Sequence, residues 1–185
     1  MIFGGSDFDF SPLDDTWTWD GAAWTQQDVV GPSPRAGAIM ASANGTVVLF
    51  GGVAGEQFMA DTWTWDGTLW TERSTSGPSP RSVAAMAALN GTVVLFGGSG
   101  GVSALSDTWT WDGTTWTQQS VVGPSARENA AVATLGDSVV LFGGEDTSGA
   151  PLGDTWIWDG ATWSERLVSG PPPRSAATMA LVAGP

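Results

Sequence analysis

The chain has 185 residues and a formal net charge of −13 at pH 7, with six arginines and no lysine, histidine or cysteine. Phosphate binding needs clustered cations, so this balance argues against nucleic acid and against an anionic membrane surface as partners. The usual ligands of zinc, copper and iron are missing, and a serine nucleophile would have no histidine base. We therefore expect no metal site, no cofactor and no enzymatic activity.

Hydrophobic residues make up 42% of the chain, which favours a packed core over disorder. No run of about 18 apolar residues exists, so no membrane-spanning helix is expected. Met1 begins directly on a repeated motif, so no signal peptide is expected either. A single domain covering residues 1–185 is the predicted organisation, and nothing in the composition indicates a cellular compartment.

The chain begins with MIFGG at 1–5, which matches the end of an apolar segment that recurs three more times. The full copies are TVVLFGG at 46–52 and 92–98, and SVVLFGG at 138–144. Their unbroken apolar runs predict strands that are buried on both faces. A loop of variable sequence follows each copy.

A tryptophan-rich segment comes next, and its four copies hold all twelve tryptophans of the chain. They read DTWTWDGAAWTQQ at 15–27, DTWTWDGTLWTER at 61–73, DTWTWDGTTWTQQ at 107–119 and DTWIWDGATWSER at 154–166. Their first tryptophans are Trp17, Trp63, Trp109 and Trp156, at steps of 46, 46 and 47 residues. A fixed period of this length is typical of repeat architectures.

Each copy reads as two strands joined by a tight turn. In the third copy, Trp109 and Trp111 lie two residues apart and so project from one face of an extended chain. The Asp112-Gly113 pair suits a hairpin turn, and Trp116 opens the return strand. The tryptophans could form a stacking platform for sugars or bases. Packing between sheets is the favoured interpretation, because a ligand site rarely needs four copies.

A proline-rich linker ending in arginine leads into a strand of small apolar residues. The linkers are GPSPR at 31–35 and 77–81, GPSAR at 123–127 and GPPPR at 170–174. The strands that follow are RAGAIMASA at 35–43, RSVAAMAAL at 81–89, RENAAVATL at 127–135 and RSAATMALV at 174–182. Turns at Asn44-Gly45, Asn90-Gly91 and Gly136-Asp137 connect these strands to the next apolar strand. One unit thus contains four predicted strands.

This pattern resembles the kelch repeat over essentially the whole chain. The doubled glycine after an apolar strand, the later aromatic, the tryptophan five residues beyond it and the Pro-x-Pro-Arg linker all match. Trp111 stands where the family usually has tyrosine, and the histidine that usually follows the arginine is absent. The resemblance implies an all-β propeller in which each unit is one four-stranded antiparallel blade.

The two ends of the chain complement each other, which predicts a closed ring of four blades. Blade 1 would combine 174–185 with 1–30, and blades 2, 3 and 4 would cover 35–74, 81–120 and 127–167. Pairing of the C-terminal strand with the N-terminal strand would leave no open edge at the seam. The alternative is a strand-swapped dimer in which two chains share an eight-bladed ring. A monomer is the favoured prediction.

The variable loops are the predicted binding surface, because binding residues often lie on loops held by a rigid frame. The partner would be a protein or a small ligand. Candidate contact residues form an acidic, partly apolar rim: Phe8, Phe10, Glu56, Phe58, Met59, Glu128, Asn129 and Asp146. The linker arginines could hold an anion, but a structural role is favoured for them and for the first tryptophans. These arginines are Arg35, Arg81, Arg127 and Arg174.

Two other functions remain open at this stage. The near identity of the units is typical of a recently amplified or designed array, or of part of a larger propeller, that serves structure or assembly and binds no ligand. A carbohydrate-binding domain that uses surface tryptophans is the third hypothesis.

Overall fold

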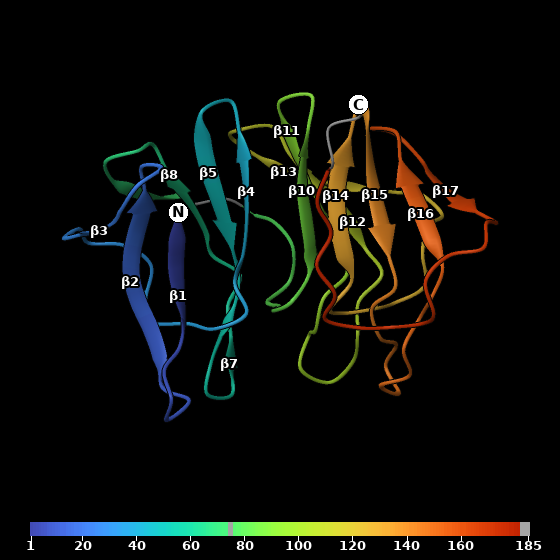
Figure 1. The fold of residues 1–185 in the computed structure, drawn as a ribbon, viewed down its shortest axis with the longest axis horizontal. Helices are drawn as coiled ribbons and strands as arrows, with labels where there is room; N and C mark the ends of the chain where they lie inside the picture. Colours follow the sequence, from blue (N-terminus) through green and yellow to red (C-terminus); the bar gives the residue numbers. More distant parts are fainter. Residues whose placement is uncertain (74–75, 182–185) are drawn as a thin grey trace.

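The structure is a computed structural model that describes residues 1–73 and 76–181. Within these ranges it contains strands and no helix. Its four main antiparallel sheets follow one another along an arc, with the first sheet at one end and the fourth at the other (Figure 1). No helix in the described part of the chain is long and apolar enough to cross a membrane.

The first sheet has three strands and the other three have four. The first contains β1 (Ile2–Ser6), β2 (Pro12–Trp19) and β3 (Trp24–Gln27). The second contains β4 (Ile39–Ala43), β5 (Thr46–Phe50), β8 (Thr62–Trp65) and β9 (Trp70–Arg73). The third contains β10 (Ala85–Leu89), β11 (Thr92–Phe96), β12 (Thr108–Trp111) and β13 (Trp116–Gln119). The fourth contains β14 (Ala131–Leu135), β15 (Ser138–Phe142), β16 (Thr155–Trp158) and β17 (Trp163–Arg166).

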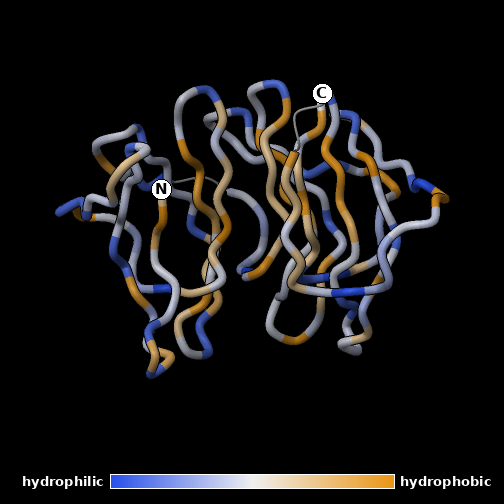
Figure 2. Tube along the Cα trace, in the orientation of Figure 1, coloured by the Kyte–Doolittle hydropathy of each residue, from blue (hydrophilic) through white to orange (hydrophobic). Residues whose placement is uncertain are grey.

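The repeated sequence produces a repeated register. In the third sheet Leu95 lies opposite Trp109 and Val93 opposite Trp111, and the second and fourth sheets pair the equivalent residues in the same way. Val93 and Leu95 project to one face of β11 and Val94 and Phe96 to the other, and all four are at most 3% exposed, which confirms that the second strand of a unit is covered on both faces. Figure 2 shows these apolar strands as the most hydrophobic parts of the trace.

The predicted turns are present. Asn44 and Asn90 adopt positive φ angles of 51° and 50°, a conformation that asparagine tolerates better than most residues. In the third tryptophan hairpin, the Asp112 carboxylate accepts hydrogen bonds from the backbone N–H groups of Thr114 and Thr115, at 2.8 Å each. This loop fixes Trp116 directly opposite Trp111 at the start of the return strand.

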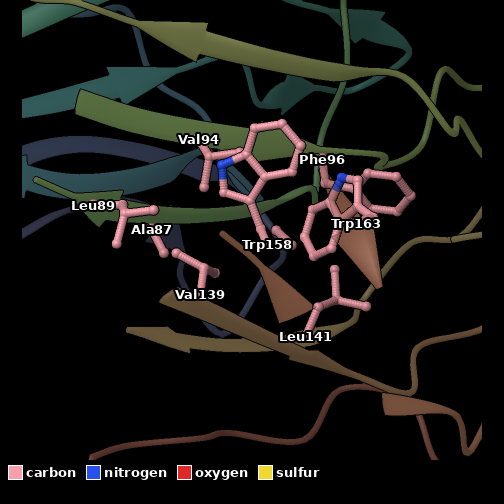
Figure 3. Packing of buried hydrophobic residues seen from close by; sticks show 9 residues of the cluster. Ala87, Leu89, Val94, Phe96, Val139, Leu141, Trp158 and Trp163 are labelled. Carbon is pink, nitrogen blue, oxygen red and sulfur yellow. The ribbon is translucent and has the colours of Figure 1, made fainter. Parts of the chain in front are cut away.

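Neighbouring sheets are joined by an indole from the later sheet that is buried against the earlier one. Trp163 on β17 contacts Phe96 edge-on, at a ring centroid distance of 5.4 Å, and donates a hydrogen bond of 3.0 Å to the Thr108 hydroxyl. Figure 3 shows Trp158 and Trp163 lying between strands of the third and fourth sheets. The other two junctions use the same contacts, Trp70 with Phe3 and Thr16, and Trp116 with Phe50 and Thr62. Packing between sheets is therefore what these tryptophans do.

The expected closure of four blades within one chain is absent from the described residues. β1 is the edge of its sheet and pairs only with β2, and residues 174–181 form no strand. Arg174 and Ala176 hydrogen-bond to Gly144, Leu152 and Asn129, as the equivalent residues do at each internal junction, but β1 lies at the opposite end of the arc, so no strand partner among the described residues is present beside them. The C-terminal segment thus stays at the far end of the arc from β1. Residues 182–185, which the blade 1 prediction includes, lie outside the described residues.

Two tryptophans at the same repeat position differ sharply in exposure, and their substitution tests the packing. Trp111 is 1% exposed and Trp19 is 47% exposed. We predict that Trp111→Ala lowers the free energy of unfolding by about 3–5 kcal/mol through cavity formation, and that Trp19→Ala costs clearly less. Urea unfolding of both variants measures the difference. Equal costs would contradict the burial of indoles between sheets.

Candidate functional site

The variable loops gather at one end of the sheets, where Figure 1 shows them below the strands. They comprise residues 7–11 between β1 and β2, the small hairpin of β6 (Val53–Ala54) and β7 (Gln57–Phe58), residues 99–106 and residues 145–153. The hairpins that join β4 to β5, β10 to β11 and β14 to β15 lie at the opposite end. We call the first end the variable-loop face.

The first loop presents two phenylalanines on a fixed turn. Phe8 and Phe10 are 96% and 88% exposed. The Asp7 carboxylate accepts hydrogen bonds from the backbone N–H groups of Asp9 and Ser11, at 2.9 and 2.8 Å, and the Phe10 N–H donates to the Asp7 carbonyl. Phe10 has a φ of 61°, an uncommon angle for a bulky residue. The turn thus holds two aromatic rings in water.

The second loop is less exposed than the sequence suggests. Glu56 lies exposed at the hairpin tip, but Phe58 and Met59 are only partly exposed. A side chain at Gly101 would meet the Phe58 ring at 2.9 Å, so this ring lies against the backbone of the third loop. The Met59 N–H donates to the Gly52 carbonyl. Phe58 therefore packs between two loops and does not stand free beside Phe8 and Phe10.

Three predicted residues come together at the loops of the third and fourth sheets. Glu128 and Asp146 line a cavity of about 360 Å³, and Asn129 donates a hydrogen bond of 2.8 Å to the Glu145 carboxylate. Glu145, which the prediction omitted, lies directly opposite Glu128 and also lines the cavity. The sequence could have indicated this residue. Glu145 directly follows the glycine pair Gly143-Gly144, and the residues at the same repeat position, Val53 and Ser99, are uncharged.

These carboxylates make an acidic pocket without assembling a metal site. Among residues 1–73 and 76–181, no group of three or more acidic, histidine or cysteine side chains is arranged to hold a metal ion. The hydrogen bonds that Asp146 accepts from Ser148 and Ala150 lower its pKa, so this carboxylate stays charged in moderately acidic solution. The pocket is therefore a place of negative potential between two loops.

Three of the linker arginines are buried and form ion pairs where the variable loops join the strands. Arg81 donates two parallel hydrogen bonds to Asp107, at 2.6 and 2.8 Å, and a further one of 2.9 Å to the Gly97 carbonyl. Arg35 and Arg127 do the same to Asp61 and Asp154, and all three guanidinium groups are at most 1% exposed. With every donor directed into the protein, these arginines support the loops and offer no site for an anion.

The fourth arginine differs. Arg174 is exposed, and its guanidinium donates from Nε to the Pro172 carbonyl. In the other linkers a serine hydroxyl also accepts from the arginine, and Pro172 replaces that serine. Its aspartate counterpart by repeat position is Asp15 in the first sheet, at the other end of the arc.

The first tryptophan of each unit is tied to the same aspartates. The indole N–H groups of Trp63, Trp109 and Trp156 donate to Asp61, Asp107 and Asp154 at 2.7 Å, and Trp17 donates to Asp15. Burial alone would raise the pKa of the three arginine-bound carboxyls. The hydrogen bonds and charge of the arginine, together with the indole N–H, outweigh burial, so each pKa lies below its usual value.

The comparison with protein families agrees with this geometry. The model described as the KLHDC2/KLHL20/DRC7 Kelch-repeats domain matches residues 1–118 and 67–184, which together span nearly the whole chain. A comparison with curated proteins gave no match.

Removing one partner of a buried ion pair tests the role of the arginines. Asp107→Ala leaves the Arg81 charge buried without its carboxylate, so we predict a loss of about 2–3 kcal/mol in the free energy of unfolding. This value is at the low end for a buried pair because Asp107 keeps some contact with water. Glu72→Ala, which removes an exposed carboxylate, is the matched control and should change little. Equal effects in a denaturant titration would show that the pair contributes nothing.

Acid should weaken the same three pairs together. A carboxyl whose pKa is lower in the folded chain than in the unfolded one stabilises the fold fully above its unfolded pKa of about 4. That contribution is lost as the pH falls through the lower, folded values. We therefore predict that the thermal midpoint stays constant near neutral pH and drops below about pH 4. Circular dichroism melts at a series of pH values measure it, and a midpoint that rises in acid would contradict the assignment.

Proposed function

Because the chain belongs to the kelch-repeat family, whose domains are generally non-catalytic and typically bind proteins, we propose that it is a non-enzymatic binding module. Its contact surface is the variable-loop face. The blades of this module are 35–74, 81–120 and 127–167, together with a first blade that contains 1–30.

The exposure of Phe8 and Phe10 carries this proposal. Two aromatic rings in water cost free energy, and a hydrogen-bonded turn around Asp7 keeps them apart from the core. Aromatic side chains with restricted freedom are effective binding anchors, because little conformational entropy is lost when they are covered. Two exposed aromatic rings held close together on a hydrogen-bonded turn favour a contact surface.

The charge around the rings indicates the chemistry of the partner. Asp9 and Glu56 lie exposed on the first two loops, and Glu128, Glu145 and Asp146 line the pocket at the other end of the face. The whole chain carries 19 acidic residues against six arginines. A segment of protein with apolar residues flanked by lysine or arginine complements such a surface, and the attraction would accelerate binding at low salt.

A peptide-selection experiment tests this function. We expect the chain to select peptides that combine basic and aromatic or aliphatic residues from a displayed random library, with binding that weakens as salt is raised. Phe8→Ser combined with Phe10→Ser should reduce the affinity by about tenfold or more. The matched control is Val30→Ser with Val122→Ser, which removes two similarly exposed apolar side chains that lie directly before the linkers. Binding that both double variants lose equally, or the absence of any selected peptide, would contradict the proposal.

A further inference from the structure

The open ends of the arc carry the two halves of a contact that the chain already makes three times. At each internal junction an indole from the outer hairpin of one sheet fits against a phenylalanine, a threonine and a linker glycine of the preceding sheet. Gly77 shows the fit: a Cβ added to it would lie 2.7 Å from the Trp116 ring, next to Phe50 and Thr62. Gly31 and Gly123 take the same place at the other two junctions, with added Cβ atoms 2.6 and 2.7 Å from Trp70 and Trp163.

We call the site formed by the phenylalanine, the threonine and the linker glycine the socket. On the fourth sheet no described side chain fills it. Phe142, Thr155 and Gly170 hold the three positions, and Phe142 and Thr155 line a cavity of about 360 Å³. A Cβ added to Gly170 would meet nothing closer than the Phe142 ring at 3.9 Å, whereas the equivalent glycines lie directly against an indole. Within the described residues, therefore, this socket lacks the side chain that fills the other three.

The first sheet offers the missing side chain. Trp24 is the equivalent of Trp70, Trp116 and Trp163, yet it is 47% exposed where they are 6–7% exposed. Trp24 packs against Trp19 at a centroid distance of 5.4 Å, in nearly the same tilted geometry as Trp65 with Trp70. The indole pair is thus already shaped for a junction.

The backbone at the two ends is complementary as well. The C-terminal segment lies on the fourth sheet, where Ala177 and Met179 border Phe142 as the equivalent Ala84 and Met86 pack with Phe50. That is the place of the first strand of a following sheet. The first sheet lacks this strand, since β1 is its edge. The register of the other sheets would put Met179 opposite Ile2, as Met86 lies opposite Leu95.

Two further pairs point the same way. Arg174 is exposed at one end and its counterpart by repeat position, Asp15, belongs to the other end, so charges of opposite sign would meet. A chain of backbone hydrogen bonds also links one sheet to the next. The N–H groups of Val83, Asn129 and Ala176 donate to the carbonyls of Gly37, Val83 and Asn129, the equivalent residues one sheet earlier, at 2.9–3.0 Å. Among the described residues this series starts at the Gly37 carbonyl and ends at the Ala176 N–H, which leaves the Gly37 N–H and the Ala176 carbonyl for the next contact.

We propose that two copies of this chain join head to tail into one ring of eight sheets, in which the Trp24 of each copy enters the Phe142–Thr155–Gly170 socket of the other. The three internal junctions share one geometry, and Figure 1 shows β3, the strand that begins with Trp24, at the opposite end of the arc from the fourth sheet. Closing four sheets on themselves would require all three junctions to change. A second copy satisfies both ends with the contacts that the chain already uses, and a head-to-tail contact gives a closed ring when its rotation completes a full turn and a filament when it does not.

Substitutions in the socket test the proposal without disturbing the fold of one chain. Light scattering of the wild-type chain should give twice its mass of 19.1 kDa. Gly170→Ala has room in the isolated chain but would collide with an incoming indole, so it should raise the dimer dissociation constant by about 30-fold or more, as should Trp24→Ala. Gly100→Ala, whose added Cβ meets nothing closer than 3.5 Å, is the matched control and should stay dimeric. A monomeric wild type, long polymers, or a dimer that Gly170→Ala and Trp24→Ala leave intact would overturn the proposal.

A mixing experiment and a cross-link identify the two ends. Equal amounts of the Gly170→Ala and Trp24→Ala chains can form one junction in which socket and indole are both wild type, so the mixture should recover dimer that neither variant forms alone. The chain has no cysteine, so Ile2→Cys with Met179→Cys places a pair of thiols only at the proposed seam. Oxidation should yield a covalently closed dimer on a non-reducing gel. A cross-linked monomer would show closure within one chain and would overturn the proposal.

Discussion

The indole that each sheet inserts into the preceding one is the contact on which the rest of the structure depends. Burying a tryptophan side chain contributes on the order of 4–6 kcal/mol of gross hydrophobic free energy, and the hydrogen bond from its N–H to a threonine fixes its orientation. This contact sets the requirements on three other positions of the repeat. The second strand must end in phenylalanine and the third must begin with threonine, because these residues contact the indole. The linker must have glycine where it passes the indole, since a Cβ at Gly77 would collide with Trp116.

The buried arginines complete the frame near the loops. Arg81 joins the linker, the Gly97 carbonyl and Asp107, and Asp107 in turn accepts from the Trp109 indole. A buried ion pair is not by itself strong evidence of stability. Its value here is geometric, because it fixes the start and end of a variable loop relative to the strands. Loops that are held at both ends can change in sequence without loss of the frame, and the four loops of this chain do differ where the strands do not.

The sequence was sufficient to predict the strands, the turns and the inter-sheet role of tryptophan, because a fixed period repeats every local signal. It failed where the repeat breaks, at the two ends of the chain. The ends of the chain match in sequence, which predicted pairing of residues 174–182 with 1–5, but residues 174–181 contact the fourth sheet, at the opposite end of the arc from β1. Register alone carries no information on the angle between sheets, and that angle decides how many sheets a ring needs.

The candidate site shows the same division. Phe8 and Phe10 were predicted as exposed and are so, because their loop turns on itself around Asp7. Phe58 was grouped with them by composition, yet its ring lies on Gly101 in a neighbouring loop. Contacts between loops depend on distances across sheets, which a reading along the chain does not supply. Glu145, by contrast, was within reach of sequence reasoning once its position after the glycine pair was compared with Val53 and Ser99.

Hydrogen exchange of the indole N–H groups, followed by NMR, tests the central contact most directly. The N–H groups of Trp70, Trp116 and Trp163 are buried and bonded to threonine hydroxyls of the preceding sheet. They should exchange only when a junction opens, at rates orders of magnitude below those of the unfolded chain. Exchange of these three groups as fast as in denaturant would mean that no indole is held between the sheets, and the account would be wrong.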